Sequence, residues 1–183
     1  MSLPPFRFLA VFCVLVFACQ GCTTSPSGRW RFLESGTDTL RLGISVDEIR
    51  KVYGSATGYE GGGHGFSYAY KDEGGRGCLI LDIQDKGVET LILRETRRAP
   101  PASKSVILRE GDLRTSRGLS LGDPPGKVER ILGKPHEARY EGNKLTYAYH
   151  ASVEECSQVG CCYDGFYEFE DGRLVEISLH DGC

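Results

Sequence analysis

The chain has 183 residues, of which 26% are charged and 40% hydrophobic, and its formal net charge is −3 at pH 7. This balance excludes a polyanion-binding surface and a polybasic membrane patch, so we expect no nucleic-acid partner. The 24 glycines fall mainly in turns between short apolar runs, which favours a β-rich protein of hairpins over a helical bundle.

The chain begins with a segment typical of export. Residues 8–18 form an apolar run behind Arg7 that is too short to span a bilayer but suits a secretory signal. The run ends in Val16-Phe-Ala-Cys19, which resembles the lipobox of bacterial lipoproteins. We therefore predict a signal peptide over 1–18 and lipidation of Cys19, with Cys22 as the alternative acceptor. Ordinary signal-peptidase cleavage, with both cysteines kept in a secreted product, is the competing interpretation.

A lipidated Cys19 would attach the protein to a membrane without a transmembrane helix, because each buried methylene contributes about 0.8 kcal/mol. Residues 19–28 are polar and read as a short tether. Gln20 is not the Asp that retains lipoproteins at the inner membrane, so the resemblance implies the outer membrane, facing the periplasm. The expected location is therefore the cell envelope.

Most of the remaining chain repeats one pattern at a constant offset. Leu40-Arg-Leu-Gly43 reappears as Leu119-Ser-Leu-Gly122, and Tyr68-Ala-Tyr70 reappears as Tyr147-Ala-Tyr149. We predict a tandem duplication that stacks into a single α+β scaffold. Its predicted parts are a first repeat over 29–96, a linker over 97–105 and a second repeat over 106–183.

Each repeat is predicted to begin with a short helix. Ser45 and Glu48 have the spacing of a capping box, whereas in the second repeat Asp123 can cap and Pro124 can occupy the first helical position. Apolar residues recur at i, i+3 and i+4 before a glycine in both segments: Ile49, Val52 and Tyr53 before Gly54, and Val128, Ile131 and Leu132 before Gly133. Helices of two turns are unstable alone, so they must pack on strands.

A Tyr-Ala-Tyr strand and a hairpin follow each helix. In the second hairpin the apolar residues of both strands are odd-numbered, from Tyr167 to Leu179. A two-residue turn would pair odd with even residues, so the pattern predicts a three-residue loop around Asp171-Gly172 with a glycine in the left-handed region. The first hairpin has the same parity across Asp85-Lys-Gly87.

This order of motifs, including Leu132-Gly133 and Pro135, resembles the SmpA/OmlA (BamE) group of small outer-membrane lipoproteins. It also resembles the β-lactamase inhibitor proteins, which carry two such modules on a continuous antiparallel sheet. The resemblance implies short helices packed on antiparallel hairpins, binding to other proteins, and no catalytic residues. The first repeat departs from it, because Ser55-Ala56 stands where the second repeat has Lys134-Pro135.

The second repeat carries an unrepeated insertion, Cys156-Ser-Gln-Val-Gly-Cys161-Cys162. Disulfides are favoured over a metal site, because an exported protein is oxidised and adjacent cysteines do not easily ligate one tetrahedral ion. Antiparallel pairing continued outward along the hairpin brings Cys183 beside Cys161 or Cys162. We predict Cys161–Cys183 and Cys156–Cys162, one of three possible connectivities. Cys78 either pairs with Cys22 or stays free.

The repeated tyrosines are the best candidates for a partner-binding surface, since tyrosine supplies contact area at low entropic cost. Tyr68, Tyr70, Tyr147 and Tyr149 fall on one face of equivalent strands. If the helices cover the other face, the four tyrosines form an exposed aromatic stripe. The alternative is that this face packs on the helices.

No catalytic constellation emerges from the remaining residues. The histidines at 64, 136, 150 and 180 lack the spacing of a zinc hydrolase, and no nucleophile elbow is present. We therefore expect no cofactor, no metal and no small-molecule substrate. The predicted function is non-catalytic binding of an unidentified envelope protein, as an assembly scaffold or an inhibitor of an exported enzyme. The alternative is a metal- or thiol-dependent envelope enzyme that uses the Cys156–Cys162 loop.

Overall fold

The computed structural model describes residues 36–56, 59–60, 66–84, 87–150 and 163–181. The predicted signal peptide and tether lie outside these residues, as do the predicted lipidation site, Cys19 or Cys22. The four cysteines of the predicted disulfides lie outside them too: Cys156, Cys161, Cys162 and Cys183.

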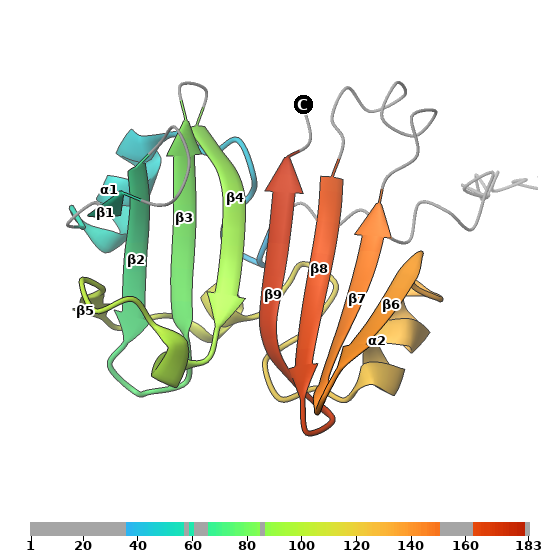
Figure 1. Cartoon of the computed structure of the whole chain (residues 1–183). Helices are drawn as coiled ribbons and strands as arrows, with labels where there is room; N and C mark the ends of the chain where they lie inside the picture. The colour runs from blue at the N-terminus through green and yellow to red at the C-terminus, as the bar shows by residue number, and fades with distance from the viewer. Residues whose placement is uncertain (1–35, 57–58, 61–65, 85–86, 151–162, 182–183) are drawn as a thin grey trace, which may run out of the picture.

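The described residues form an α+β fold in which both α-helices lie on one side of a single mixed sheet (Figure 1). The sheet has nine strands in the order β1-β2-β3-β4-β9-β8-β7-β6, and β5 pairs parallel with β2. The elements in chain order are α1 (Val46–Tyr53), β1 (Tyr59–Glu60), β2 (Phe66–Asp72), β3 (Cys78–Gln84), β4 (Gly87–Arg94), η2 (Thr96–Arg98), β5 (Lys104–Val106), η3 (Glu110–Leu113), α2 (Pro125–Leu132), β6 (Glu137–Glu141), β7 (Lys144–His150), β8 (Tyr163–Glu170) and β9 (Arg173–Asp181).

The centre of the sheet is the antiparallel pair β4–β9, which joins the last strand of the first half of the chain to the last strand of the second half. Leu91 lies opposite Leu179, and Leu93 lies opposite Ile177. All four leucine and isoleucine side chains are buried on the helix side. One continuous sheet and one main core therefore run through both halves of the molecule. At the far side from β2, the strand β6 pairs only with β7 among the described strands.

The two helices begin in different ways. At α1 the predicted capping box is confirmed, with the Ser45 hydroxyl accepting from the Glu48 amide and the Glu48 carboxylate accepting from the Ser45 amide. At α2 the prediction is wrong by one residue, because Pro124 is the N-cap and Pro125 is the first helical residue. The Asp123 carboxylate accepts from the Ser120 amide at 2.8 Å instead, so it stabilises the preceding turn.

Equivalent hydrogen bonds tie each helix to the strands beneath it. The Tyr70 hydroxyl donates to the Gly54 carbonyl at 3.1 Å, and the Tyr149 hydroxyl donates to the Gly133 carbonyl at 3.0 Å. Both glycines end their helix at a positive φ, a backbone conformation that residues other than glycine rarely adopt. Each helix thus has its last turn fixed by a tyrosine from the neighbouring sheet.

The hairpin loop differs from the prediction of three residues. Glu170 pairs with Arg173 across the two-residue turn Asp171-Gly172, where φ is 50° and 73°. The odd residue is a β-bulge in the strand, because Glu168 lies opposite Glu176 while Phe169 lies opposite Leu174. The first hairpin has a register shift at the corresponding place, between Asp82 and Ile83. The parity of the apolar residues requires one extra residue, and a bulge in the strand accommodates it as well as a longer loop would.

The segment predicted as a linker over 97–105 is packed against the sheet. It contains η2 and β5 residues, and it crosses the face opposite the two α-helices to reach the edge of β2. Ala99 packs there on a small second core of Ala69, Cys78 and Ile80. Cys78 is fully buried and is a free thiol, so of its two predicted fates the structure shows the second.

We expect Tyr70→Phe and Tyr149→Phe each to lower the free energy of unfolding by about 1 kcal/mol, because each leaves a helix-end carbonyl without its donor. The two losses should add, since the sites are far apart. Urea unfolding of the single and double variants measures this. Tyr68→Phe is the matched control: its half-exposed hydroxyl accepts from Arg50 at 3.1 Å, and its loss should cost under roughly 0.5 kcal/mol. A neutral Tyr149→Phe would contradict the role given to this bond.

Candidate functional site: the face of the sheet opposite the helices

The tyrosines proposed for partner binding lie on the covered face of the sheet. Tyr70, Tyr147 and Tyr149 are at most 5% exposed, and they belong to the same core as Ile49 and Val128 of the helices. Tyr68 is half-buried and also packs against that core. The exposed aromatic stripe is therefore not formed, because the helices need this face to bury their own apolar residues.

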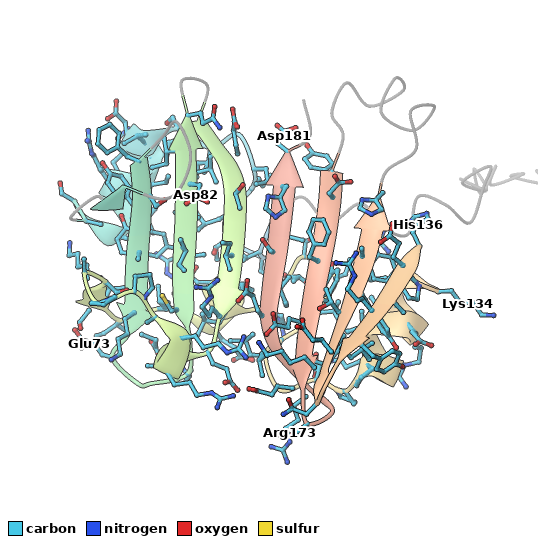
Figure 2. The ribbon with its side chains drawn as sticks, in the orientation of Figure 1. Glu73, Asp82, Lys134, His136, Arg173 and Asp181 are labelled. Carbon is cyan, nitrogen blue, oxygen red and sulfur yellow. The ribbon has the colours of Figure 1, made fainter. Side chains whose placement is uncertain are left out.

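The opposite face carries a row of polar side chains that crosses six strands in register. From β7 to β2 the residues directly opposite one another are His150, Asp164, His180, Thr90, Asp82 and Ser67. We call these six residues the polar row. Figure 2 looks onto this face, with Asp82 labelled on one side of the sheet and His136 on the other. Successive strands of a sheet lie about 4.8 Å apart, so the side chains of the row meet their neighbours.

Hydrogen bonds join neighbouring members of the polar row. His150 Nδ1 lies 3.1 Å from Asp164 Oδ1, and His180 Nδ1 lies 3.0 Å from the Thr90 hydroxyl. The Ser67 hydroxyl donates to the Asp82 carboxylate. The other ring nitrogen of His180, Nε2, lies 2.8 Å from the Ser178 hydroxyl. Strand pairing thus brings these side chains together, and the hydrogen bonds between them hold their rotamers.

Aromatic contacts continue across the same part of the face. The Phe166 ring lies edge-to-face between His150 and His180, with ring centroids at 5.7 and 5.5 Å. His136 extends the contact, since its ring centroid is 6.0 Å from that of His150. His136 is exposed and the other three rings are half-exposed. These four residues, the aromatic patch, give the face an apolar centre beside the polar row.

The imidazoles of this face are poorly arranged to hold a metal ion. His136 Nδ1 accepts from the His150 amide at 3.0 Å, so in the neutral ring the proton occupies Nε2. Both nitrogens of His180 already face hydroxyls. Within the described ranges, no three His, Cys, Asp or Glu side chains are grouped to hold a metal. The row also differs from a Ser-His-Asp triad, because a threonine stands where the carboxylate would orient His180.

The pKa of His180 is lowered from its ordinary value of 6.5, chiefly because the ring is partly buried. The carboxylates of Asp164, Asp82 and Glu176 act in the opposite direction, but burial prevails. His180 is therefore uncharged at neutral pH.

At the end of this face nearer the crossing segment, the charged side chains form ion pairs with one another. Arg94 Nε lies 2.8 Å from Glu176, and Arg98 of η2 pairs with both Glu168 and Glu170. Lys144 approaches Glu168 to 3.7 Å. The arginine from the crossing segment thus neutralises carboxylates of β8, which lies in the other half of the sheet.

A hollow of about 150 Å³ lies elsewhere, lined by Arg76, Glu110, Leu113, Ser120 and Leu121. Its arginine is already engaged, because Arg76 binds Asp72 through two hydrogen bonds of 2.9 and 3.1 Å. The Arg76 side chain holds the pKa of Asp72 down at about 2. This pair fixes the β2–β3 turn, so the guanidinium in the hollow already has its carboxylate partner.

Comparison with known proteins assigns no family to this chain. No family model and no curated protein matches the chain. The crystal structure of a DUF4309 family protein, YjgB, from Bacillus subtilis is similar at 12% identity and a TM-score of 0.46, over 78% of this chain and 82% of that one. An extracellular protein containing an SCP domain from Bacillus anthracis is similar at 10% identity and a TM-score of 0.47, over 77% of this chain. The chain spans 44% of that protein's length.

No helix among the described residues is long and apolar enough to cross a membrane.

His136, His150 and His180 are scattered along the sequence and form no motif there, and Asp164, Phe166 and Asp82 were not predicted as site residues. A signal was available in strand parity, since Asp164, Phe166, His180 and His150 all occupy even positions, opposite to the odd-numbered apolar face. What brings them together is the β4–β9 pairing, which no local pattern specifies.

We expect the stability of the protein to fall as pH drops below about 6.5, in part through His180. Its folded pKa is lowered, so the unfolded chain binds a proton more readily and gains from acidification. His180→Gln, which keeps a hydrogen-bonding side chain without a titrating ring, should lose less stability between pH 7.5 and 5.5. Urea unfolding at both pH values measures the difference, and NMR titration of the ring locates its midpoint. A midpoint above 6.5 would contradict this account.

Proposed function

We propose that this protein is a lipid-anchored component of the cell envelope that binds another protein, without catalysis, through the face of the sheet opposite its helices. One observation carries the proposal: α1 and α2 occupy a single face, and the aromatic patch lies on the other, outside the part that the crossing segment covers. Aromatic and imidazole side chains held in register on a rigid sheet make a preformed surface, which lowers the entropic cost of binding.

The proposal includes a duplicated module as the origin of the two halves. Three features support it besides the repeated sequence. Equivalent tyrosines bond equivalent glycine carbonyls, equivalent register shifts occur in the two hairpins, and the Gly43 and Gly122 amides each donate at 2.7 Å to the strand that ends the respective half. A BamE-like or inhibitor-like pair of modules remains part of the proposal on the motifs given above.

The envelope location rests on the lipobox-like run before Cys19 and on Gln20 after it. A diacylated cysteine and the polar residues up to Gly28 would place the folded part close to the membrane surface, facing the periplasm. A partner would then be an envelope or exported protein. Scaffolding of envelope assembly and inhibition of an exported enzyme both fit such a surface, and the identity of the captured partner decides between them.

We expect mass spectrometry of the membrane-extracted protein to show a chain that begins at Cys19 and carries acyl groups there. Cys19→Ser should remove the mature form from the detergent-extracted membrane fraction, because the acceptor sulfur is gone. Cys22→Ser is the matched control and should leave the protein in that fraction. Loss of membrane attachment in Cys22→Ser alone would assign the anchor to the alternative cysteine.

A photo-crosslinking amino acid at position 166 tests the proposed surface in intact cells. We expect Phe166→p-benzoylphenylalanine to give a discrete adduct, because the half-exposed ring lies in the centre of the aromatic patch. Val52→p-benzoylphenylalanine is the control, since Val52 is 48% exposed on the helix side. Equal adducts at both positions, or none at position 166, would count against binding through this face.

A further inference from the structure

The carboxylates on the face opposite the helices are neutralised unevenly. At one end, Glu168, Glu170 and Glu176 all form ion pairs with arginines of the same protein. Among the ion pairs of the described residues, none joins a lysine or arginine to Asp82, Asp164 or Glu137. The boundary between the two groups follows the crossing segment, which supplies Arg97 and Arg98 to the first group only.

The contacts that Asp82 and Asp164 do make are with uncharged donors or an imidazole. Asp82 accepts from the Ser67 hydroxyl, and Asp164 faces His150 Nδ1. His180 stands between them in the polar row and is uncharged at neutral pH because of its burial. Among the described residues, this end of the face therefore presents two carboxylates that have no lysine or arginine partner.

The aromatic patch lies within reach of the same carboxylates. Asp164 and Phe166 are alternate residues of β8, so their side chains project from the same face about 7 Å apart. A guanidinium placed against the half-exposed Phe166 ring can reach the Asp164 carboxylate, combining a cation–π contact with a charged hydrogen bond. Asp82 lies three strands further along the row, or about 14 Å away, which is a separation that two side chains of one partner loop can span.

We infer that the partner of this face presents a cationic segment, with an arginine side chain against Phe166 and Asp164 and a second basic side chain near Asp82. This inference rests on the proposed function and names the chemistry of the partner that the function requires. A second copy that docked through its own equivalent face does not fit, because it would bring the same carboxylates against these. A neutral or acidic partner would leave Asp82 and Asp164 desolvated without a counter-charge.

The first test uses acetyl-tetra-arginine amide and acetyl-tetra-glutamate amide as probes, at low ionic strength and pH 7.5, with chemical shifts read from the protein's backbone amides. We expect saturable shifts at Asp164, Phe166 and His180 with the arginine peptide and none with the glutamate peptide. Asp164→Asn should lower the affinity for the arginine peptide about tenfold. Glu73→Gln removes the same charge from the opposite end of the strands, where Figure 2 labels it, and should change affinity less than twofold. Shifts spread evenly over the surface, or equal losses in the two variants, would overturn the inference.

The second test separates this inference from the proposed function. Photo-crosslinking at position 166 is repeated in an Asp82→Asn/Asp164→Asn background in intact cells. We expect the adduct to decrease at least fivefold, and the captured protein to have lysine or arginine in the cross-linked peptide. An undiminished adduct would leave binding through this face intact and overturn the cationic partner. Absence of an adduct in the otherwise unmodified protein would overturn both.

Discussion

Two helices of eight residues each set the constraint on which the rest of this molecule depends. Helices of this length are unstable in isolation, so each must bury an apolar face and have its last turn held from outside. Ile49 and Val128 supply the buried contact, and the hydroxyls of Tyr70 and Tyr149 hold the terminal carbonyls. Because both helices draw on the tyrosine face, the described helices leave the opposite face to the crossing segment at one end and to the polar row and aromatic patch at the other. The candidate site lies on the opposite face because the helices occupy the tyrosine face.

Much of the fold could be predicted from short-range patterns. The capping box at Ser45 and the glycines that end the helices each express a local rule, and the structure follows them. The odd-numbered apolar positions of the hairpins are buried as predicted on one side of the register shifts, whereas on the turn side the even-numbered Leu174 and Val88 join the core instead. The prediction of a three-residue hairpin loop was wrong, because the parity of the apolar residues shows that one residue is extra but does not show where it lies. No local pattern predicts β5, a three-residue strand that pairs parallel with β2 from a segment that reads as a linker.

The candidate site was harder to predict, for a physical reason. Each of six strands contributes one residue to the polar row, and neighbours such as Thr90 and His180 are separated by 90 positions in the chain. Their proximity depends on the register of β4 against β9, which is set by core packing on the other face. The repeated tyrosines were easy to recognise in the sequence. They are repeated because each half needs them to hold its helix, not because they bind a partner. The unrepeated residues of the opposite face are the ones left to distinguish this protein.

The edge strand β6, which pairs only with β7 among the described strands, bears on how copies of this protein can meet. All five residues of β6 are exposed, and Glu137, Arg139 and Glu141 alternate along it. If two copies aligned these edges antiparallel over their full length, Glu137 would stand opposite Glu141 and Arg139 opposite itself, which disfavours the pairing. Open sheet edges on two copies of a protein otherwise tend to pair with each other. The charge order of this one short strand thus disfavours edge-to-edge association between copies.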